Sequence, residues 1–99
     1  MIEPPFHVRA IRAVAKEAEV PEAVIIGPSR RREAVHARWA VMVAMRERLS
    51  CGRPTTFNMI GRRFSDRDPT TVLYGLDQAT YLARRDAGFA ALVEIARTA

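Results

Sequence analysis

Cysteine, histidine and lysine are nearly absent from this 99-residue chain, which has one cysteine, two histidines and Lys16 as its single lysine. A lone cysteine excludes an intramolecular disulfide and a zinc site built on several thiolates, and it is typical of proteins that stay in a reducing cytoplasm. His7 and His36 are too few for a metal cluster. We therefore expect no metal ion or other cofactor, and a cytoplasmic location.

Long apolar runs and catalytic motifs are also missing. No stretch approaches the roughly 18 uninterrupted apolar residues of a membrane span, and residues 1–5 lack the basic and apolar regions of a targeting signal. The sequence contains neither the phosphate loop G-x-x-x-x-G-K-[ST] nor the nucleophile elbow G-x-S-x-G. We therefore expect no membrane contact, no small-molecule substrate and no enzymatic activity.

Arginine is the residue that the chain has in excess. The sequence has 16 basic and 11 acidic residues and a net charge of +5, and 15 of the basic residues are arginine. The planar guanidinium suits phosphates and base edges, which makes nucleic acid the leading partner class. A preference for arginine over lysine also follows from genomic base composition, so the skew alone does not choose between the two explanations.

The spacing of apolar residues predicts one all-α domain, residues 6–99, of about six helices behind an N-terminal tail, residues 1–5. We find no period-2 strand and no internal repeat. The third helix is expected to be the central strut, with Val35, Met42, Met45 and Leu49 facing inward, and residues 23–26 are expected to be largely buried. The predicted helices span residues 6–18, 22–26, 30–49, 57–64, 69–85 and 89–96.

Turn and cap residues divide these helices. Pro21 suits the first position of the second helix, while Ser29 and Thr56 are N-cap candidates for the third and fourth helices. Residues 50–55 read as a surface loop in which Cys51 is an incidental thiol. Asp68-Pro69 is a strong helix start, because the carboxylate accepts from free N–H groups and proline fits the first position.

The fourth and fifth predicted helices have the form of a helix-turn-helix. In that motif the first turn of the second helix meets base edges in the major groove, and here it carries Asp68, Thr70 and Thr71. Threonine hydroxyls and methyls can contact bases, and a carboxylate can accept from the cytosine amino group. Asp68-Pro69 would equally cap a helix that binds nothing.

Three segments resemble the C-terminal DNA-binding domain of the bacterial replication initiator DnaA family. Arg67 to Tyr74 reads R-D-P-T-T-V-L-Y, which is similar to the family signature R-D-H-T-T-V-L-H. Gly27 to Arg38 resembles the family's basic loop and the segment that follows it, and Ile60 to Phe64 resembles the I-G-x-x-F of the first motif helix. The similarity runs in order from about Phe6 to Arg85, and it implies the helix-turn-helix fold and a double-stranded DNA partner.

The resemblance also implies roles for individual residues. Arg30, or alternatively Arg31, would enter the minor groove, and Arg38 would approach the major groove or its phosphates. An arginine run is also commonly a solvated surface, although cations oppose the positive end of a helix dipole. The complete set of candidate DNA-binding residues is Arg30, Arg31, Arg32, Arg38, Trp39, Thr56, Arg67, Asp68, Pro69, Thr70 and Thr71.

In the second motif helix, Arg67 and Thr71 would anchor phosphates, and Asp68 and Thr70 would read bases. Two residues depart from the family pattern. Pro69 replaces a histidine and offers no donor, and Trp39 replaces a glutamine and has one N–H donor.

The third departure is the loop at residues 50–55, which is longer than the family's by about four residues. The family's AAA+ module has no counterpart here, so we expect a stand-alone DnaA-like protein, either a regulator or a phage or plasmid relative.

The leading hypothesis is sequence-preferring binding of double-stranded DNA in replication initiation or its regulation. The alternative is a protein-interaction module that kept the fold and lost specific readout, using the surface around Trp39 and Pro69 or the last helix. That last helix could close the core or form a dimer seam.

Overall fold

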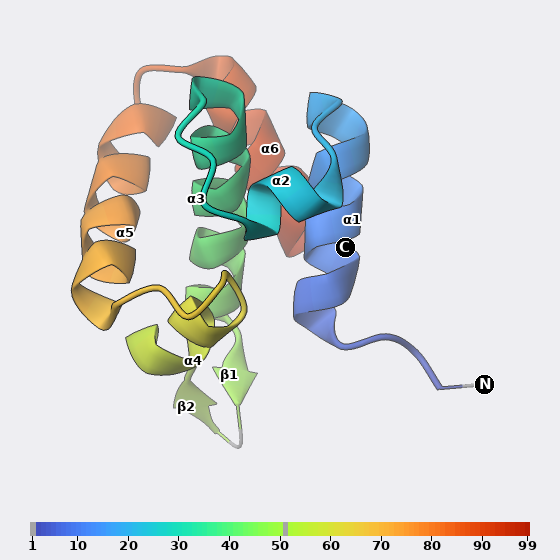
Figure 1. Ribbon diagram of the computed structural model, residues 1–99, viewed down its shortest axis with the longest axis vertical. Helices are drawn as coiled ribbons and strands as arrows, with labels where there is room; N and C mark the ends of the chain where they lie inside the picture. The colour runs from blue at the N-terminus through green and yellow to red at the C-terminus, as the bar shows by residue number, and fades with distance from the viewer. Residues whose placement is uncertain (1, 51) are drawn as a thin grey trace.

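The computed structural model describes residues 2–50 and 52–99, which form six helices and one short hairpin (Figure 1). The all-α class is confirmed, with the hairpin as a minor addition. The structure does not describe the side chain of Leu49, which was predicted to face inward, or residue Cys51, which was predicted to be an incidental thiol. The elements are α1 (Phe6–Ala18), α2 (Glu22–Ile26), α3 (Arg32–Glu47), β1 (Leu49–Ser50), β2 (Arg53–Pro54), α4 (Phe57–Arg62), α5 (Pro69–Ala83) and α6 (Ala87–Arg97).

Helix α3 is the central strut, as its apolar spacing predicts. It contacts α1, α2, α4, α5 and α6, with α1 and α5 on opposite sides of it (Figure 1). Met42 and Met45 are buried in the core, whereas Val35 is half-buried. The side chains buried in the main cluster include Ile11, Val14, Ile25, Val41, Met42, Ile60, Phe64 and Val72.

Helix α2 buries less of its apolar run than predicted. Of residues 23–26, only Ile25 is fully buried, while Val24 and Ile26 are half-buried. A five-residue helix turns its side chains through more than a full circle, so consecutive residues cannot all face inward. The helix spans Glu22–Ile26 as predicted, with Pro21 at the N-cap and not at the first helical position.

Helix α3 begins at Arg32, and the prediction that Ser29 caps it was wrong. Arg31 occupies the N-cap position and makes no side-chain capping bond. Ser29 Oγ instead accepts a hydrogen bond from the Arg31 N–H at 3.3 Å, within an extended segment. The loop between α2 and α3 is therefore longer than the sequence suggested.

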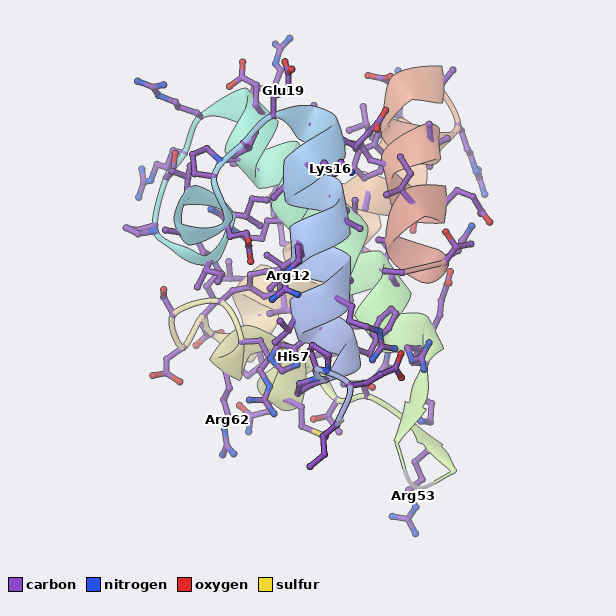
Figure 2. The ribbon with its side chains drawn as sticks, turned by 90° about the vertical axis from the view of Figure 1, so that its right-hand side faces the viewer. His7, Arg12, Lys16, Glu19, Arg53 and Arg62 are labelled. Atoms are coloured by element: carbon purple, nitrogen blue, oxygen red, sulfur yellow. The ribbon has the colours of Figure 1, made fainter. Side chains whose placement is uncertain are left out.

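The predicted loop at residues 50–55 contains an antiparallel hairpin, in which Leu49 pairs with Pro54 and Ser50 with Arg53. Strands of two residues are too short to show an alternating pattern, so the sequence could not reveal them. Thr55 ties the hairpin to the end of α3 by donating its N–H and its hydroxyl to the Arg48 carbonyl, at 3.3 and 3.0 Å. Arg53 projects at the hairpin's far end (Figure 2).

The helix-turn-helix forms from α4 and α5 as predicted. The Thr56 hydroxyl caps α4 by accepting from the Met59 N–H at 3.1 Å. Ser65 and Asp66 adopt the left-handed region, with φ of 58° and 52°, and reverse the chain. Gly61 permits close packing, because a Cβ there would overlap the Arg67 carbonyl oxygen, and its own carbonyl accepts from the Arg67 N–H at 2.9 Å.

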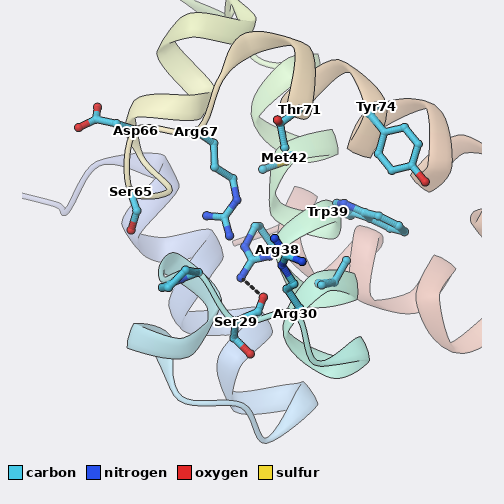
Figure 3. Close-up of a pocket in the computed structure, with 12 residues that line it drawn as sticks. Ser29, Arg30, Arg38, Trp39, Met42, Ser65, Asp66, Arg67, Thr71 and Tyr74 are labelled. Carbon is cyan, nitrogen blue, oxygen red and sulfur yellow. Dashed lines mark hydrogen bonds between the residues drawn. The ribbon is translucent and has the colours of Figure 1, made fainter.

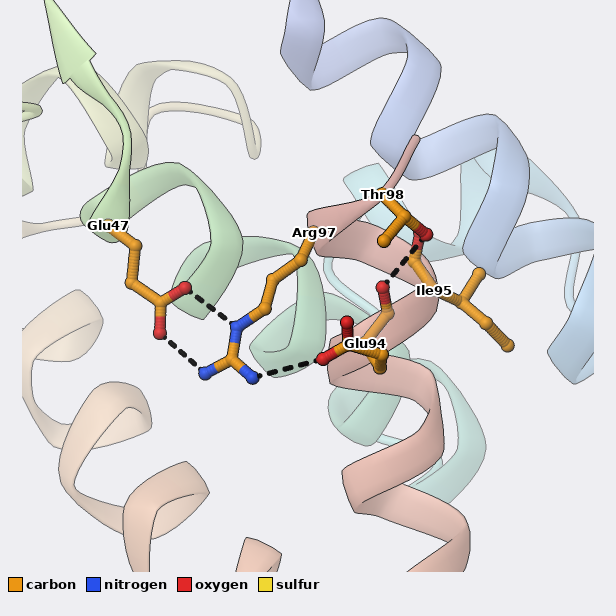
Figure 4. A network of polar contacts seen from close by, with 5 residues as sticks. All are labelled: Glu47, Glu94, Ile95, Arg97 and Thr98. Atoms are coloured by element: carbon orange, nitrogen blue, oxygen red, sulfur yellow. Dashed lines mark hydrogen bonds and ion pairs between the residues drawn. The ribbon is translucent and has the colours of Figure 1, made fainter.

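Helix α6 packs into the core of the domain. Phe89, Val93 and Ala96 are buried in it, and the helix contacts α1, α3 and α5. Arg97 also reaches back to the end of α3, where it donates to both carboxylate oxygens of Glu47 at 2.6 and 2.7 Å (Figure 4). The apolar side of this helix is thus used within the domain.

Candidate nucleic-acid interface

A cleft of about 580 Å³ separates the loop between α2 and α3 from the start of α5 (Figure 3). Four parts of the chain form its walls: the loop, α3, the turn of the helix-turn-helix and α5. The lining residues are Pro28, Ser29, Arg30, Val35, Arg38, Trp39, Met42, Ser65, Asp66, Arg67, Thr71 and Tyr74. Three of these twelve side chains are cationic and one is anionic, so the cleft favours an anionic ligand.

The arginine triplet divides among three surfaces. Arg30 is exposed and lines the cleft. Arg31 lines a hollow beside Glu19 and Pro21, and Arg32 lines a third hollow beside α6. The structure therefore brings Arg30, the first of the two minor-groove candidates, next to the helix-turn-helix, and it does not bring Arg31 or Arg32 there.

The first turn of α5 is open to solvent. Asp68 Oδ1 accepts from the Thr70 N–H at 2.7 Å, and Pro69 is the first helical residue, so the predicted cap is confirmed. Asp68, Pro69, Thr70 and Thr71 are all exposed, and Thr71 lines the cleft opposite Arg30. Capping uses one oxygen of the Asp68 carboxylate, and the Thr71 side chain is the one of this turn that lines the cleft.

Arg38 lines the cleft but is nearly buried, and the resemblance's prediction that it approaches DNA stays a prediction. The residue is 4% exposed, and its guanidinium is held by backbone carbonyls at the end of α2 and in the loop. Nε donates to the Ile25 carbonyl at 2.7 Å, and Nη2 donates to the Gly27 carbonyl at 2.8 Å. Burial, and secondarily the charge of Arg67, lower the pKa of Arg38 to about 10, which leaves it a cation at neutral pH.

Arg67 is half-buried and is occupied in a similar way. Its Nη1 donates to the Phe64 carbonyl at 2.8 Å, and its Nη2 donates to the Gly27 carbonyl at 2.8 Å. Burial lowers the pKa of Arg67. These bonds join the turn of the helix-turn-helix to the loop, while the phosphate-anchoring role that the resemblance implies for Arg67 stays a prediction.

Trp39 is half-buried against α5 at the edge of the cleft. Its indole stacks on His36, with ring centroids 5.6 Å apart, and it packs on Gly75 so closely that a Cβ there would lie 2.7 Å from Nε1. Trp39 therefore acts as cover for the α3–α5 contact and still lines the cleft.

Thr56 does not line the cleft, and its hydroxyl serves the α4 cap. Tyr74 was missed as a candidate, although it lines the cleft and is 60% exposed. It lies three residues after Thr71, which is one helical turn, so helical spacing from the predicted first turn could have identified it.

In the part of the chain that the structure describes, no three histidine, cysteine, aspartate or glutamate side chains are grouped to hold a metal ion. No helix built from the described residues has both the length and the apolar character that crossing a membrane requires.

A family model described as "Bacterial dnaA protein helix-turn-helix" matches residues 9–79, a range that runs from α1 through most of α5. The chain belongs to this family. The match includes the basic loop, α4, the turn and most of α5, so it covers every residue that lines the cleft. The DnaA helix-turn-helix is a DNA-binding domain and not a catalytic one.

Relatives of the DnaA family support the assignment. The chain is similar to the chromosomal replication initiator protein DnaA of Thermomicrobium roseum, with 38% identity over 76 residues, and to that of Rippkaea orientalis, with 37% over 76 residues. It is 35% identical over 92 residues to that of Nostoc punctiforme. These alignments cover 77–87% of this chain and 16–19% of the relatives. No solved structure matches the chain significantly.

Proposed function

We propose that this chain binds double-stranded DNA with a preference for sequence, with the first turn of α5 in the major groove and Arg30 in the adjacent minor groove. The observation that carries the proposal is that exposed Arg30 and exposed Thr71 line the two sides of one cleft. A helix start offers threonine side chains and free N–H groups to bases and phosphates. An arginine on a neighbouring loop suits the negative potential of a narrow minor groove.

The relatives' name connects this binding to chromosomal replication. We infer that the chain occupies sites used in replication initiation or its regulation, in the bacterial cytoplasm where the DNA lies. The inference is confined to the DNA-binding step, because the aligned region is 16–19% of the relatives' length.

Net charge alone does not support this interface over the rest of the surface. Figure 2 shows Arg12 and Lys16 along α1, and Arg62 on α4. None of these three residues lines the cleft. The proposal therefore rests on the arrangement of hydrogen-bonding side chains at the start of α5, and the test must separate sequence readout from general attraction to phosphate.

Selection of bound sequences from a random pool of duplexes, at a stated salt concentration, tests the proposal first. We expect one sequence to be enriched. Fluorescence anisotropy with the selected and a scrambled duplex should then give affinities that fall with salt, with a log–log slope of about −5 if roughly six phosphates are neutralised. Binding that does not depend on salt, or a pool without enrichment, contradicts the proposal.

Thr70→Ala tests readout directly. We expect it to reduce the ratio of the affinity for the selected duplex to that for the scrambled duplex by roughly tenfold. The affinity for the scrambled duplex itself should change little. Thr80→Ala is the matched control, because Thr80 is also exposed on α5 but lies about 15 Å further along the helix and donates its hydroxyl to the Leu76 carbonyl. It should leave the ratio within about twofold of wild type.

The protein-interaction module remains the competing hypothesis for the same surface. It predicts weak binding that ignores sequence, and a Thr70→Ala variant indistinguishable from Thr80→Ala. Such a partner would dock on the surface around Trp39 and Pro69 or on the solvent-facing side of α6, whose apolar side is buried in the core.

A further inference from the structure

Three side chains converge on the carbonyl end of α2, and we call Arg38, Ser65 and Arg67 the carbonyl clamp. Arg38 comes from α3, while Ser65 and Arg67 come from the turn of the helix-turn-helix (Figure 3). Arg38 binds the carbonyls of Val24, Ile25, Gly27 and Ser29 at 2.7–3.3 Å. Ser65 Oγ donates to the Ile26 carbonyl at 3.0 Å, and Arg67 donates to the carbonyls of Ile26 and Gly27 at 3.3 and 2.8 Å.

The clamp supplies hydrogen-bond donors to carbonyls that α2 leaves without partners. The last four carbonyls of any helix lack partners within it, and α2 is only five residues long. Guanidinium groups satisfy such carbonyls and complement the negative end of the helix dipole. Neither Arg38 nor Arg67 forms an ion pair with a carboxylate among the described residues, so carbonyl dipoles are what hold these two charges in place.

The clamp also fixes the basic loop that follows α2. Residues 28–31 form neither helix nor strand, and Pro28 has no N–H to donate. The loop's carbonyl anchors at Gly27 and Ser29 are both bound by Arg38. Arg67, which shares the Gly27 carbonyl, immediately precedes the Asp68 cap of α5. The Gly27 carbonyl therefore links the loop to α3 through Arg38 and to the start of α5 through Arg67.

We infer that the carbonyl clamp holds the basic loop at a set position relative to α5, so that Arg30 meets the minor groove when α5 occupies the major groove. Arg38, Ser65 and Arg67 are positioning residues in this arrangement and do not contact DNA. The inference rests on the proposed function. A loop that is already ordered loses less conformational freedom on binding, which raises affinity without adding a contact.

A substitution series at Arg67 separates positioning from phosphate contact. Arg67→Gln removes the charge, and Arg67→Lys keeps it but cannot reproduce the fork that reaches Ile26, Gly27 and Phe64 together. If Arg67 positions the loop, both variants weaken binding of the selected duplex to a similar extent. Affinity retained by Arg67→Lys and lost by Arg67→Gln would show a phosphate contact and overturn the inference.

A double-mutant cycle with Arg30 identifies what the clamp acts through. Arg30→Ala is expected to weaken binding by roughly tenfold or more in the wild-type protein, but by less than about twofold in the Arg67→Gln protein, because the loop is then already misplaced. Arg62→Gln is the matched background, since Arg62 is an exposed arginine of α4 outside the cleft. There the effect of Arg30→Ala should keep its full size. Equal effects in both backgrounds overturn the inference.

Amide hydrogen exchange of residues 29–32 in the free protein provides a readout that does not need DNA. We expect faster exchange in Arg67→Gln and in Ser65→Gly, which removes the hydroxyl while keeping a residue that tolerates the positive φ. Ser65→Gly keeps the test usable if the arginine variants fail to fold. Circular dichroism checks that each variant retains its helices. Unchanged exchange in folded variants overturns the clamp. Absence of duplex binding by the wild-type protein instead overturns the proposed function, and with it the clamp's role in DNA binding.

Discussion

Gly61→Ala is a perturbation whose effect the structure determines closely. The new methyl group would overlap the carbonyl oxygen of Arg67, and it would also approach the Val72 side chain at 3.4 Å. The carbonyl belongs to the backbone just before the α5 cap, so it cannot rotate away as a side chain could. Relief requires α4 and the turn to separate, and that movement breaks the hydrogen bond from the Arg67 N–H to the Gly61 carbonyl.

The magnitude follows from three terms. Overpacking costs about 1–3 kcal/mol, and loss of one hydrogen bond costs about 1 kcal/mol more. Alanine recovers up to about 1 kcal/mol through its higher helix propensity. We expect the free energy of unfolding to fall by about 2 kcal/mol, which lowers the melting temperature of a domain of this size by roughly 8–16 °C. Most of the variant stays folded at 25 °C, because small domains are stable by about 5–15 kcal/mol.

Thermal unfolding followed by circular dichroism measures this effect, and duplex binding should fall with it because the start of α5 moves. Gly88→Ala is the control substitution. Its Cβ would lie 3.2 Å from Asp86 Oδ1, which caps α6 by accepting from the Phe89 N–H. A weakened cap and the gain in helix propensity act in opposite directions, so the stability should stay within about 1 kcal/mol of wild type. A melting temperature for Gly61→Ala within about 2 °C of wild type would refute the close contact on which the reasoning depends.

Three further substitutions test other parts of the fold. Asp68→Ala removes the α5 cap and should cost about 1 kcal/mol of unfolding free energy, whereas Asp77→Ala, exposed in mid-helix, should change it by less than about 0.5 kcal/mol. Glu19→Gly should raise the free energy of unfolding by about 0.4–1 kcal/mol, because Glu19 ends α1 with φ of 56°, which glycine adopts more readily. Chemical denaturation would show a lower free energy of unfolding if that conformation were not populated. Gly75→Ala should push the indole of Trp39 outward, and since this is the chain's one tryptophan, its emission maximum should shift to longer wavelength; an unchanged spectrum would argue against the packing.

Local signals in the sequence were sufficient for the helices and for the caps that involve neighbouring residues. Thr56 and Asp68 bind N–H groups three and two residues away, so the pattern of residues predicts the bond. Ser29 shows the limit of this reasoning. It has the chemistry of an N-cap, but the loop that contains it is held by Arg38 from α3, which delays the start of the helix to Arg32.

The roles of the individual arginines could be assigned only from the tertiary structure. Arg30, Arg38 and Arg67 look alike in the sequence, and all three were candidates for DNA contact. One is exposed at the cleft, while the other two are held by carbonyls, in the case of Arg67 from residues 40 and 41 positions away. No pattern within a window of the sequence reports such contacts.

The sequence by itself determined the all-α class, the helix-turn-helix and the exposed first turn that follows Asp68, because helical periodicity and capping depend on residues close together in the chain. The tertiary structure decided which arginine is exposed at the cleft and which arginines fasten the basic loop to the helix-turn-helix. Burial and hydrogen bonding between distant segments set those roles, since a guanidinium surrounded by carbonyls is a structural group and the same guanidinium in solvent is free to bind a ligand.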